Sequence, residues 1–170
     1  MNKVVAGRMS ADIEGDFVVF LIGMRFNRPW HVIKNLYVFT AMPRMLFHLR
    51  KRPELGLLHA MLLVGSGGPV VIQYWRSVDQ LEEFARSASS PHYPAWKVWN
   101  RMIGYRKPYV GVWHESYQVK AGNYECLYGN MPRFGLARAA QHVPVERKGA
   151  TAAQRRGAAP VAAPVDADAA

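Results

Sequence analysis

Four stretches of this chain are rich in apolar residues, many of them β-branched or aromatic. They cover residues 16–26 (DFVVFLIGMRF), 57–64 (LLHAMLLV), 70–75 (VVIQYW) and 109–119 (YVGVWHESYQV). Such runs are typical of β-strands that are covered on both faces. A sheet built from them cannot leave a whole face in water without exposing a very large apolar patch. The fold must therefore cover both faces of a sheet.

The longest helical pattern lies between the first two of these runs. Within residues 30–49, one side of a helix would be apolar and most polar residues would fall on the other; the apolar side consists of Val32, Leu36, Phe39, Leu46 and Phe47. We expect this apolar side to pack against the sheet. Pro43 is expected to kink or split the helix, because proline removes a backbone donor and clashes with the preceding turn.

Two further helical segments lie between the third and fourth apolar runs. Ser77 followed by Gln80 has the form of a capping box, and apolar residues recur at helical spacing after it. The segment SASSPHYP, residues 87–94, breaks this helix, and Pro94 suits the first turn of a third helical piece.

The order of these segments is strand, helix, strand, strand, helix, strand. This order predicts an α+β domain with the split βαβ arrangement of ferredoxin-like folds. The helices of such a domain cover only one face of the sheet. We therefore expect two copies of the chain to pack their other faces together as a homodimer, a closed dimeric α+β barrel.

The composition changes near the C-terminus. From Val143 the chain consists mainly of Ala, Pro, Arg and Gly and ends in GAAPVAAPVDADAA, with no aromatic residue. Such a segment cannot bury enough apolar surface to offset the entropy of ordering it. We expect one domain over residues 1–140 and a disordered tail over residues 141–170.

Charge and cysteine content limit the partners that can be expected. The formal net charge is +10, but the cations are scattered apart from Arg50-Lys51-Arg52, and no nucleic-acid-binding module accompanies them, so we expect no nucleic-acid partner. The single cysteine, Cys126, cannot form an intramolecular disulfide or a thiolate metal site by itself. Without a pattern typical of a secretion signal, a cytoplasmic location is expected.

The helix over residues 30–49 allows one other partner. An apolar side followed by Arg50-Lys51-Arg52 is compatible with a helix that rests on an anionic membrane surface. Burial of the same apolar side against the sheet is the simpler explanation. Peripheral membrane contact is therefore the less favoured interpretation.

Two histidines are candidates for chemistry. His92 and Trp96 are four residues apart at a helix start, which places an imidazole and a large aromatic ring on one side. On the last strand, alternation places His114 on the face of Val112, opposite Glu115. Each histidine is either a pocket base or a structural side chain held by a hydrogen bond.

Several classes of site are excluded by motif. The cluster GSGG leads into a strand and not into a helix, so it does not form a phosphate-binding loop. The sequence contains no HExxH pair, no recognisable zinc spacing and no GxSxG nucleophile elbow. We therefore expect no nucleotide and no protein-bound metal ion.

Four segments of the chain carry a resemblance to a known family. VIQYWRSVDQLEEFARS, PHYPAWKVWNR, VGVWHESYQV and YGNMPRFGLA resemble antibiotic-biosynthesis-monooxygenase-like proteins, in a branch that includes a fungal terpenoid-pathway monooxygenase and uncharacterised bacterial members. The resemblance covers roughly residues 10–140. It implies a dimeric α+β barrel and an oxygenase-like enzyme of secondary metabolism, acting on a hydrophobic terpenoid or polyketide-like molecule.

The resemblance implies a reaction that needs no cofactor, in which a base removes a proton from the substrate and the carbanion reacts with oxygen. The alternatives are a haem enzyme, aldoxime-dehydratase-like or haem-degrading, with His92 as axial ligand, and a ligand-binding dimer without activity. The asparagine, tryptophan and histidine set of haem-degrading relatives has no match here. The candidate bases are His114 and His92. The candidate substrate-binding residues are Trp96, Tyr74, Arg76, Tyr117 and Trp113.

Overall fold

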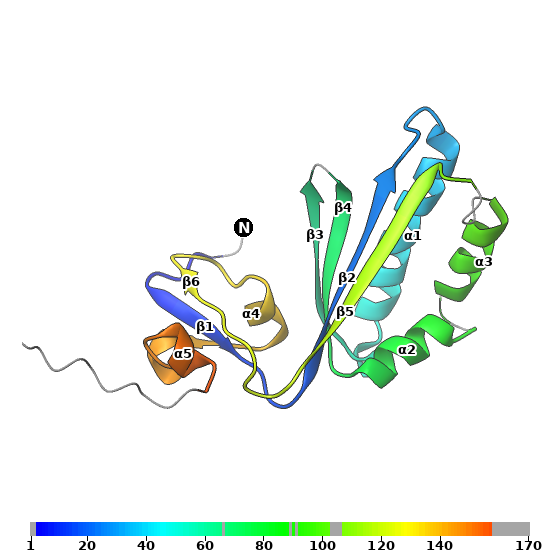
Figure 1. Cartoon of the computed structure of the whole chain (residues 1–170). Helices are drawn as coiled ribbons and strands as arrows, with labels where there is room; N and C mark the ends of the chain where they lie inside the picture. The colour runs from blue at the N-terminus through cyan, green and yellow to red at the C-terminus, as the bar shows by residue number, and fades with distance from the viewer. Residues whose placement is uncertain (1–2, 66, 89, 91, 103–106, 158–170) are drawn as a thin grey trace, which may run out of the picture.

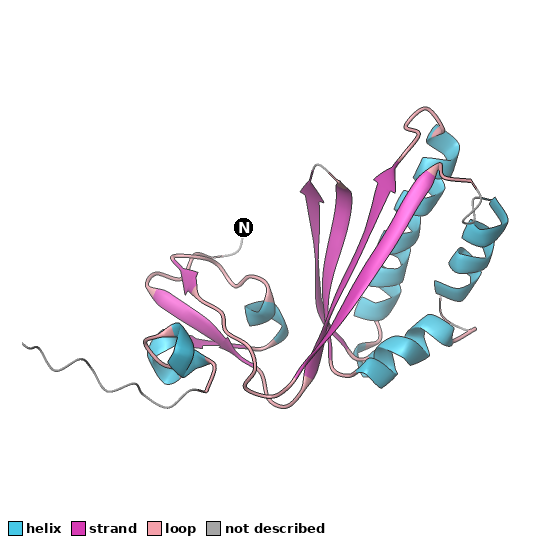
Figure 2. Cartoon of the chain, viewed as in Figure 1, coloured by secondary structure: helices cyan, strands magenta, loops and turns pink. Residues whose placement is uncertain are grey.

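In the computed structural model, the chain is described over residues 3–65, 67–88, 90, 92–102 and 107–157. Its main part is a four-stranded antiparallel sheet with helices on one face (Figures 1 and 2). The elements of this part are β2 (Phe17–Phe26), α1 (Val32–Arg50), β3 (Leu57–Gly65), β4 (Gly68–Trp75), α2 (Val78–Arg86), α3 (His92–Met102) and β5 (Val110–Val119), with a 3-10 turn at Pro53–Leu55.

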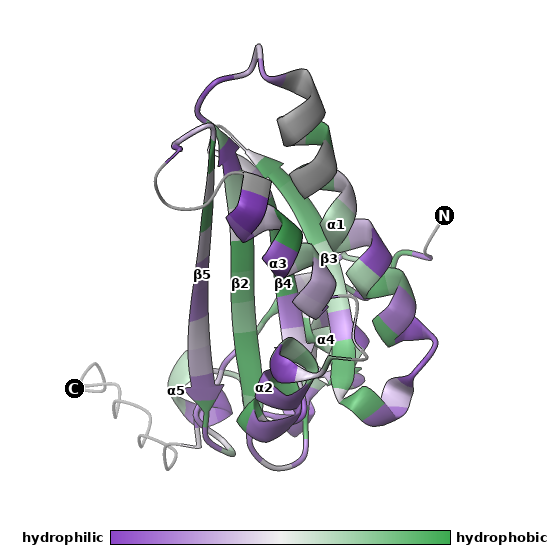
Figure 3. Cartoon of the chain, turned by 90° about the vertical axis from the view of Figure 1, so that its right-hand side faces the viewer, coloured by the Kyte–Doolittle hydropathy of each residue, from purple (hydrophilic) through white to green (hydrophobic). Residues whose placement is uncertain are grey.

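The strand order of this sheet is β3-β4-β2-β5, so the first and last strands of the βαββαβ unit lie beside each other. Figure 3 looks onto the helix side, with α1, α2 and α3 in front of the strands. This is the ferredoxin-like arrangement, and it confirms the predicted α+β class and the predicted order of strands and helices. Half of the predicted capping box is present, because Ser77 Oγ accepts a 3.2 Å hydrogen bond from the backbone N–H of Gln80. The Gln80 side chain does not return this bond and donates to the backbone carbonyl of Glu54 instead.

The two faces of the sheet are assigned by register and packing. Val18 pairs with Trp75, and both are buried against Leu49 of α1 and Phe84 of α2. The residues on the same face of the sheet as Val18 and Trp75 form its helix side. The alternate residues form what we call the open face, which begins with Val19 and its partner Tyr74.

The hairpin between β3 and β4 was predicted from its glycines. Gly65 pairs with Gly68, and Gly68 has a φ of +111°, a conformation that a side chain makes unfavourable. A Cβ on Gly68 would also collide with the backbone carbonyl oxygen of Met24 on β2. Glycine is therefore required where this turn passes the neighbouring strand.

Helix α1 differs from its prediction in two ways. Pro43 lies inside the continuous helix and does not split it. The side expected to pack on the sheet is covered only in part, because Leu46 is half-buried but Leu36 is 57% and Phe47 61% exposed, while Leu49 on another side is buried. The helix is apolar on most sides, so helical spacing alone could not select the side that packs. Within the described residues, no helix combines the length and apolarity needed to cross a bilayer.

A second, smaller unit was not predicted. Its three-stranded sheet has the order β6-β1-β7 and lies on the opposite side of the main sheet from α1 and α3 (Figure 1). We call it the small lobe. Its elements are β1 (Arg8–Asp12), β6 (Tyr128–Gly129), α4 (Leu136–Ala139), β7 (Gln141–Pro144), a 3-10 turn (Val145–Arg147) and α5 (Ala152–Arg155).

The small lobe corrects the predicted boundary of the tail. Residues 141–157 are part of the fold, because β7 pairs with β1 and both Val143 and Val145 are buried. Arg155 is also buried and donates a 2.7 Å hydrogen bond to Glu125. The expectation of disorder was wrong there. The overall hydrophobicity of the segment is low, but its buried valines and its pairing with a strand distant in the sequence give it an ordered structure. Residues 158–170 lie outside the described residues.

Candidate functional site

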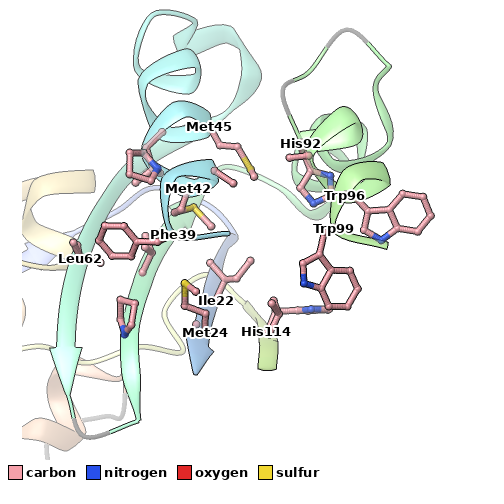
Figure 4. A pocket seen from close by; sticks show the side chains of 18 residues that line it. Ile22, Met24, Phe39, Met42, Met45, Leu62, His92, Trp96, Trp99 and His114 are labelled. Atoms are coloured by element: carbon pink, nitrogen blue, oxygen red, sulfur yellow. The ribbon is translucent and has the colours of Figure 1, made fainter. Parts of the chain in front are cut away.

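A cavity of about 360 Å³ lies between the helix side of the sheet and helices α1 and α3 (Figure 4). Its size is within the range of small-molecule sites, about 300–1,000 Å³. Most of its wall is aliphatic, aromatic or thioether. The lining residues are Ile22, Gly23, Met24, Phe39, Ala41, Met42, Pro43, Met45, Leu46, Leu62, Pro69, Val71, His92, Ala95, Trp96, Trp99, Val112 and His114.

His92 is the first residue of α3, and its side chain lines this cavity. Its Nδ1 donates a 2.9 Å hydrogen bond to the backbone carbonyl of Ala85 near the end of α2. A carbonyl can only accept, so this bond places the hydrogen on Nδ1 and leaves a lone pair on Nε2 of the neutral ring. The ring is also 6.3 Å from that of Phe84. The imidazole is therefore held in one orientation by the junction of two helices.

His114 enters the same cavity from the sheet. It follows Val112 by two residues on β5 and pairs with Ile22 of β2, and both of these residues also line the cavity. Its ring lies 5.6 Å from that of Phe20. Strand alternation placed His114 and Val112 on one face, and the structure has both on the cavity side.

The aromatic part of the wall comes from α3. Trp96 stands at the rim, where it is 48% exposed, and Trp99 lies one turn further along the helix. Figure 4 shows these rings and His92 at one end of the cavity, with Phe39 and Leu62 at the other. Trp99 was not among the predicted site residues, although its spacing of seven from His92 places it on the same side of a helix.

Tyr74 does not line this cavity. It lies on the open face and packs in a second core with Phe17 and Leu136, where the small lobe covers the sheet. The backbone of the small lobe comes close to this ring, since a Cβ on Gly135 would lie 3.4 Å from the Tyr74 hydroxyl oxygen. Burial raises the pKa of the Tyr74 hydroxyl, so the group stays protonated.

Trp113, Tyr117 and Arg76 also lie away from the cavity. Trp113 pairs with Gly23 on the open face, and its ring occupies the position where a Cβ of Gly23 would stand. The exposed Tyr117 hydroxyl donates a 2.7 Å hydrogen bond to Glu115, which raises the pKa of Tyr117. Arg76 is exposed just beyond the end of β4. Alternation places these side chains opposite His114, so one pocket cannot contain both sets.

Among the described residues, no group of three or more His, Cys, Asp or Glu side chains is arranged to hold a metal ion.

Comparison with solved structures relates this fold to known proteins. The crystal structure of aldoxime dehydratase is 18% identical with a TM-score of 0.59, covering 82% of this chain and 43% of that chain. A dimeric protein of unknown function and ferredoxin-like fold from Bacteroides fragilis is 10% identical with a TM-score of 0.41, covering 59% of this chain and 96% of that one. The likeness to aldoxime dehydratase concerns the fold alone.

Sequence comparison is more specific. Monooxygenase af470 of Aspergillus fumigatus is 30% identical over 152 residues, which cover 76% of this chain and 53% of that protein. The chain thus spans about half the length of the curated relative it matches. A family model described as "Monooxygenase af470-like" matches residues 17–136, a range that contains every residue lining the cavity. The resemblance inferred from the sequence is confirmed, and the chain belongs to the Monooxygenase af470-like family.

Proposed function

We propose that this chain is a monooxygenase-like enzyme that oxidises a hydrophobic small molecule, terpenoid or polyketide-like, in the cavity between the sheet and helices α1 and α3. One observation carries the proposal. Among the described residues that line this apolar cavity, His92 and His114 are the only ones with an ionisable side chain. Family membership supports the reaction class, since the curated relative is named a monooxygenase.

The lining suits a reaction that uses the substrate as its own electron donor. A histidine removes a proton from an acidified C–H bond, and the carbanion then transfers electrons to dioxygen. For a methylene group, the carbon gains one oxygen atom as a carbonyl. The other oxygen atom leaves as water with the two hydrogens of the methylene. This balance requires no external reductant and no bound cofactor.

Each part of the wall has a task in this scheme. The Nε2 lone pair of His92 accepts the substrate proton, and the hydrogen bond to Ala85 keeps the ring in place during the transfer. His114, on the opposite wall, orients the substrate or serves as a second proton carrier. Trp96 and Trp99 hold the apolar body of the substrate and reduce the access of water.

The test uses purified chain and a panel of apolar compounds that carry an acidic methylene beside aromatic or carbonyl groups. Oxygen uptake is followed with an electrode, and isotopically labelled dioxygen is traced into the product by mass spectrometry. We expect one labelled atom in the product for a compound that the protein turns over. Turnover that is unchanged when both histidines are replaced, as in His92→Gln with His114→Gln, would refute the proposed site.

A second candidate function is favoured by the orientation of His92. Because its Nδ1 hydrogen is donated to a backbone carbonyl, His92 would be able to hold a haem iron through Nε2. His92 is the residue that fits this role, and the iron would supply redox or Lewis-acid chemistry when bound. Titration with haem, followed by visible absorption, separates the two functions. A Soret shift that His92→Phe abolishes would favour haem.

A further inference from the structure

The outward side of α1 is apolar. Leu36 is 57% exposed, Phe39 41% and Phe47 61%, and Pro43 between them is also exposed. Their spacing of three to four residues aligns them in one stripe along the helix. On the other side of α1, Met42 and Leu49 face the cavity and the core. A helix that is apolar on both sides is typically covered on both sides.

The surroundings of this stripe are strongly basic. The sequence has no Asp or Glu from Phe17 to Pro53. Arg44 is three residues before Phe47 and Lys51 four residues after it, so both lie on the outward side with Phe47. Lys51 Nζ is 4.3 Å from the centre of the Phe47 ring. Exposed Arg50 and Arg52 add charge at the same end of the helix. The stripe is therefore apolar with basic flanks and has no carboxylate beside it in the sequence.

An exposed tryptophan precedes the helix. Trp30 is 71% exposed two residues before α1 begins. Tryptophan favours the boundary between the headgroups and acyl chains of a bilayer, where its ring is partly apolar and its N–H remains hydrated. Together with the cations at the other end, Trp30 gives α1 the features of a helix that lies in the plane of a membrane interface.

The stripe is continuous with the rim of the cavity. Phe39 and Pro43 belong to the stripe and also line the cavity, and Leu62 of β3, 56% exposed, lies beside Phe39 in Figure 4. A helix at a membrane interface enters it by about 5–10 Å. Contact through α1 would therefore bring this rim to the boundary of the acyl chains.

We propose that the outward side of α1 docks on the surface of an anionic lipid membrane. Phe47, Leu36 and Phe39 enter the interface, and Arg44, Arg50, Lys51 and Arg52 contact the lipid headgroups. The docking itself is independent of the reaction proposed above. Its consequence for catalysis, that a hydrophobic substrate passes between the bilayer and the cavity without crossing water, rests on that proposed function.

The test is flotation of the purified chain with vesicles of phosphatidylcholine alone and of phosphatidylcholine mixed with phosphatidylglycerol. We expect binding to the anionic vesicles at low salt, and much weaker binding at high salt or without the anionic lipid. Two double variants probe the surface: Leu36→Ser with Phe47→Ser, and Arg44→Gln with Lys51→Gln. Each is expected to lower the partition coefficient by about tenfold or more.

Matched controls carry the same changes elsewhere. Leu127→Ser with Phe134→Ser removes exposed apolar side chains from the small-lobe region, and Arg86→Gln with Lys97→Gln removes exposed cations from α2 and α3. Circular dichroism establishes that each variant is folded. The controls are expected to bind vesicles as the wild type does.

Three results would overturn the proposal. The first is no flotation with anionic vesicles at low salt. The second is an equal loss of binding in the control variants, which would mean that net charge alone attracts the protein. The third combines flotation with light scattering. If the wild type does not float and is an oligomer that the Leu36→Ser with Phe47→Ser changes dissociate, the stripe is a contact between copies of the chain.

Discussion

The imidazole of His92 is tied to the backbone of Ala85 by a 2.9 Å hydrogen bond from Nδ1 to the carbonyl oxygen. This contact joins the start of α3 to the end of α2 across the break between the two helices. It holds one tautomer, in which Nε2 can accept a proton. His114, by contrast, is exposed on the edge strand β5. His92 is therefore the better positioned of the two candidate bases.

Replacement of His92 by Phe tests this assignment. The ring volume is nearly kept, but the base and the donor to Ala85 are lost. We expect turnover to fall by about 10²–10⁴, and the free energy of unfolding to fall by about 1–3 kcal/mol, because the Ala85 carbonyl loses its partner. Oxygen uptake and urea denaturation measure the two effects. A variant that keeps wild-type turnover would remove His92 from the catalytic role.

Replacement of His114 by Phe is expected to separate activity from stability. Because this side chain is exposed, its loss should change the free energy of unfolding by less than about 1 kcal/mol. Turnover or ligand binding should nevertheless be lost, since the side chain lines the cavity. Glu115→Gln, a change one residue along β5 on the other face, is the matched control and should keep both. A large loss of stability with full binding would assign His114 a structural role.

The sequence identified part of this site for a physical reason. Alternation along a strand is a strict rule, so the side of His114 followed from Val112 alone. Which face of the sheet would border a cavity does not follow from alternation. For this reason the sequence also favours Tyr74, Trp113 and Tyr117 as pocket walls, although they lie on the open face. Their large aromatic rings suit a substrate wall and a core equally well.

The small lobe was missed because its signals are short and distant. Strand β1 reads RMSAD and β7 reads QHVP, and neither has the length or periodicity of a predictable strand. Their pairing joins Ser10 to Val143, which are far apart in the chain. Only the pairing makes these segments strands, so local patterns could not reveal them.

Truncation after residue 140 should destabilise the protein. It removes β7, the buried side chains of Val143 and Val145, and the Arg155 partner of Glu125. At about 1.5–3 kcal/mol for each buried valine, we expect the melting temperature to fall by roughly 10 °C or more. Truncation after residue 157 is the control and should leave it nearly unchanged. Equal melting temperatures for both truncations would contradict the role of β7.

Stability should rise with pH between about pH 5 and 7.5. Burial lowers the pKa of His59 from its ordinary value of 6.5, with Arg138 and Arg50 adding to the effect, and burial also lowers the pKa of His142. At a pH between their folded and unfolded pKa values, these two histidines therefore bind protons in the unfolded chain but not in the folded chain. The stabilisation is complete above the unfolded pKa and is lost as the pH falls through the folded values.

The measurement is the urea midpoint across this pH range. His59→Phe and His142→Phe should each flatten its rise with pH, because each removes one group whose pKa differs between the folded and unfolded states. The buried Nε2 of each ring has no hydrogen-bond partner within the described residues, so Phe leaves no protein group unsatisfied at that atom. A midpoint that is constant or falls with rising pH would rule out this linkage.

The last prediction concerns the open face, which we propose to be the contact between two copies of the chain. The small lobe covers its lower part at Val19 and Tyr74, but Leu63 remains 42% exposed and Trp113 39% exposed on its upper part. Burying this part in a second copy would remove apolar surface from water, which favours association. Light scattering at micromolar concentration should therefore give a homodimer.

Leu63→Glu with Trp113→Glu should give a folded monomer, because each dimer would then bury unpaired carboxylates. Leu36→Ser with Phe47→Ser, on the outward side of α1, should remain dimeric. A wild-type monomer would refute the contact, and dissociation by the α1 variant alone would move it to the other side of the molecule.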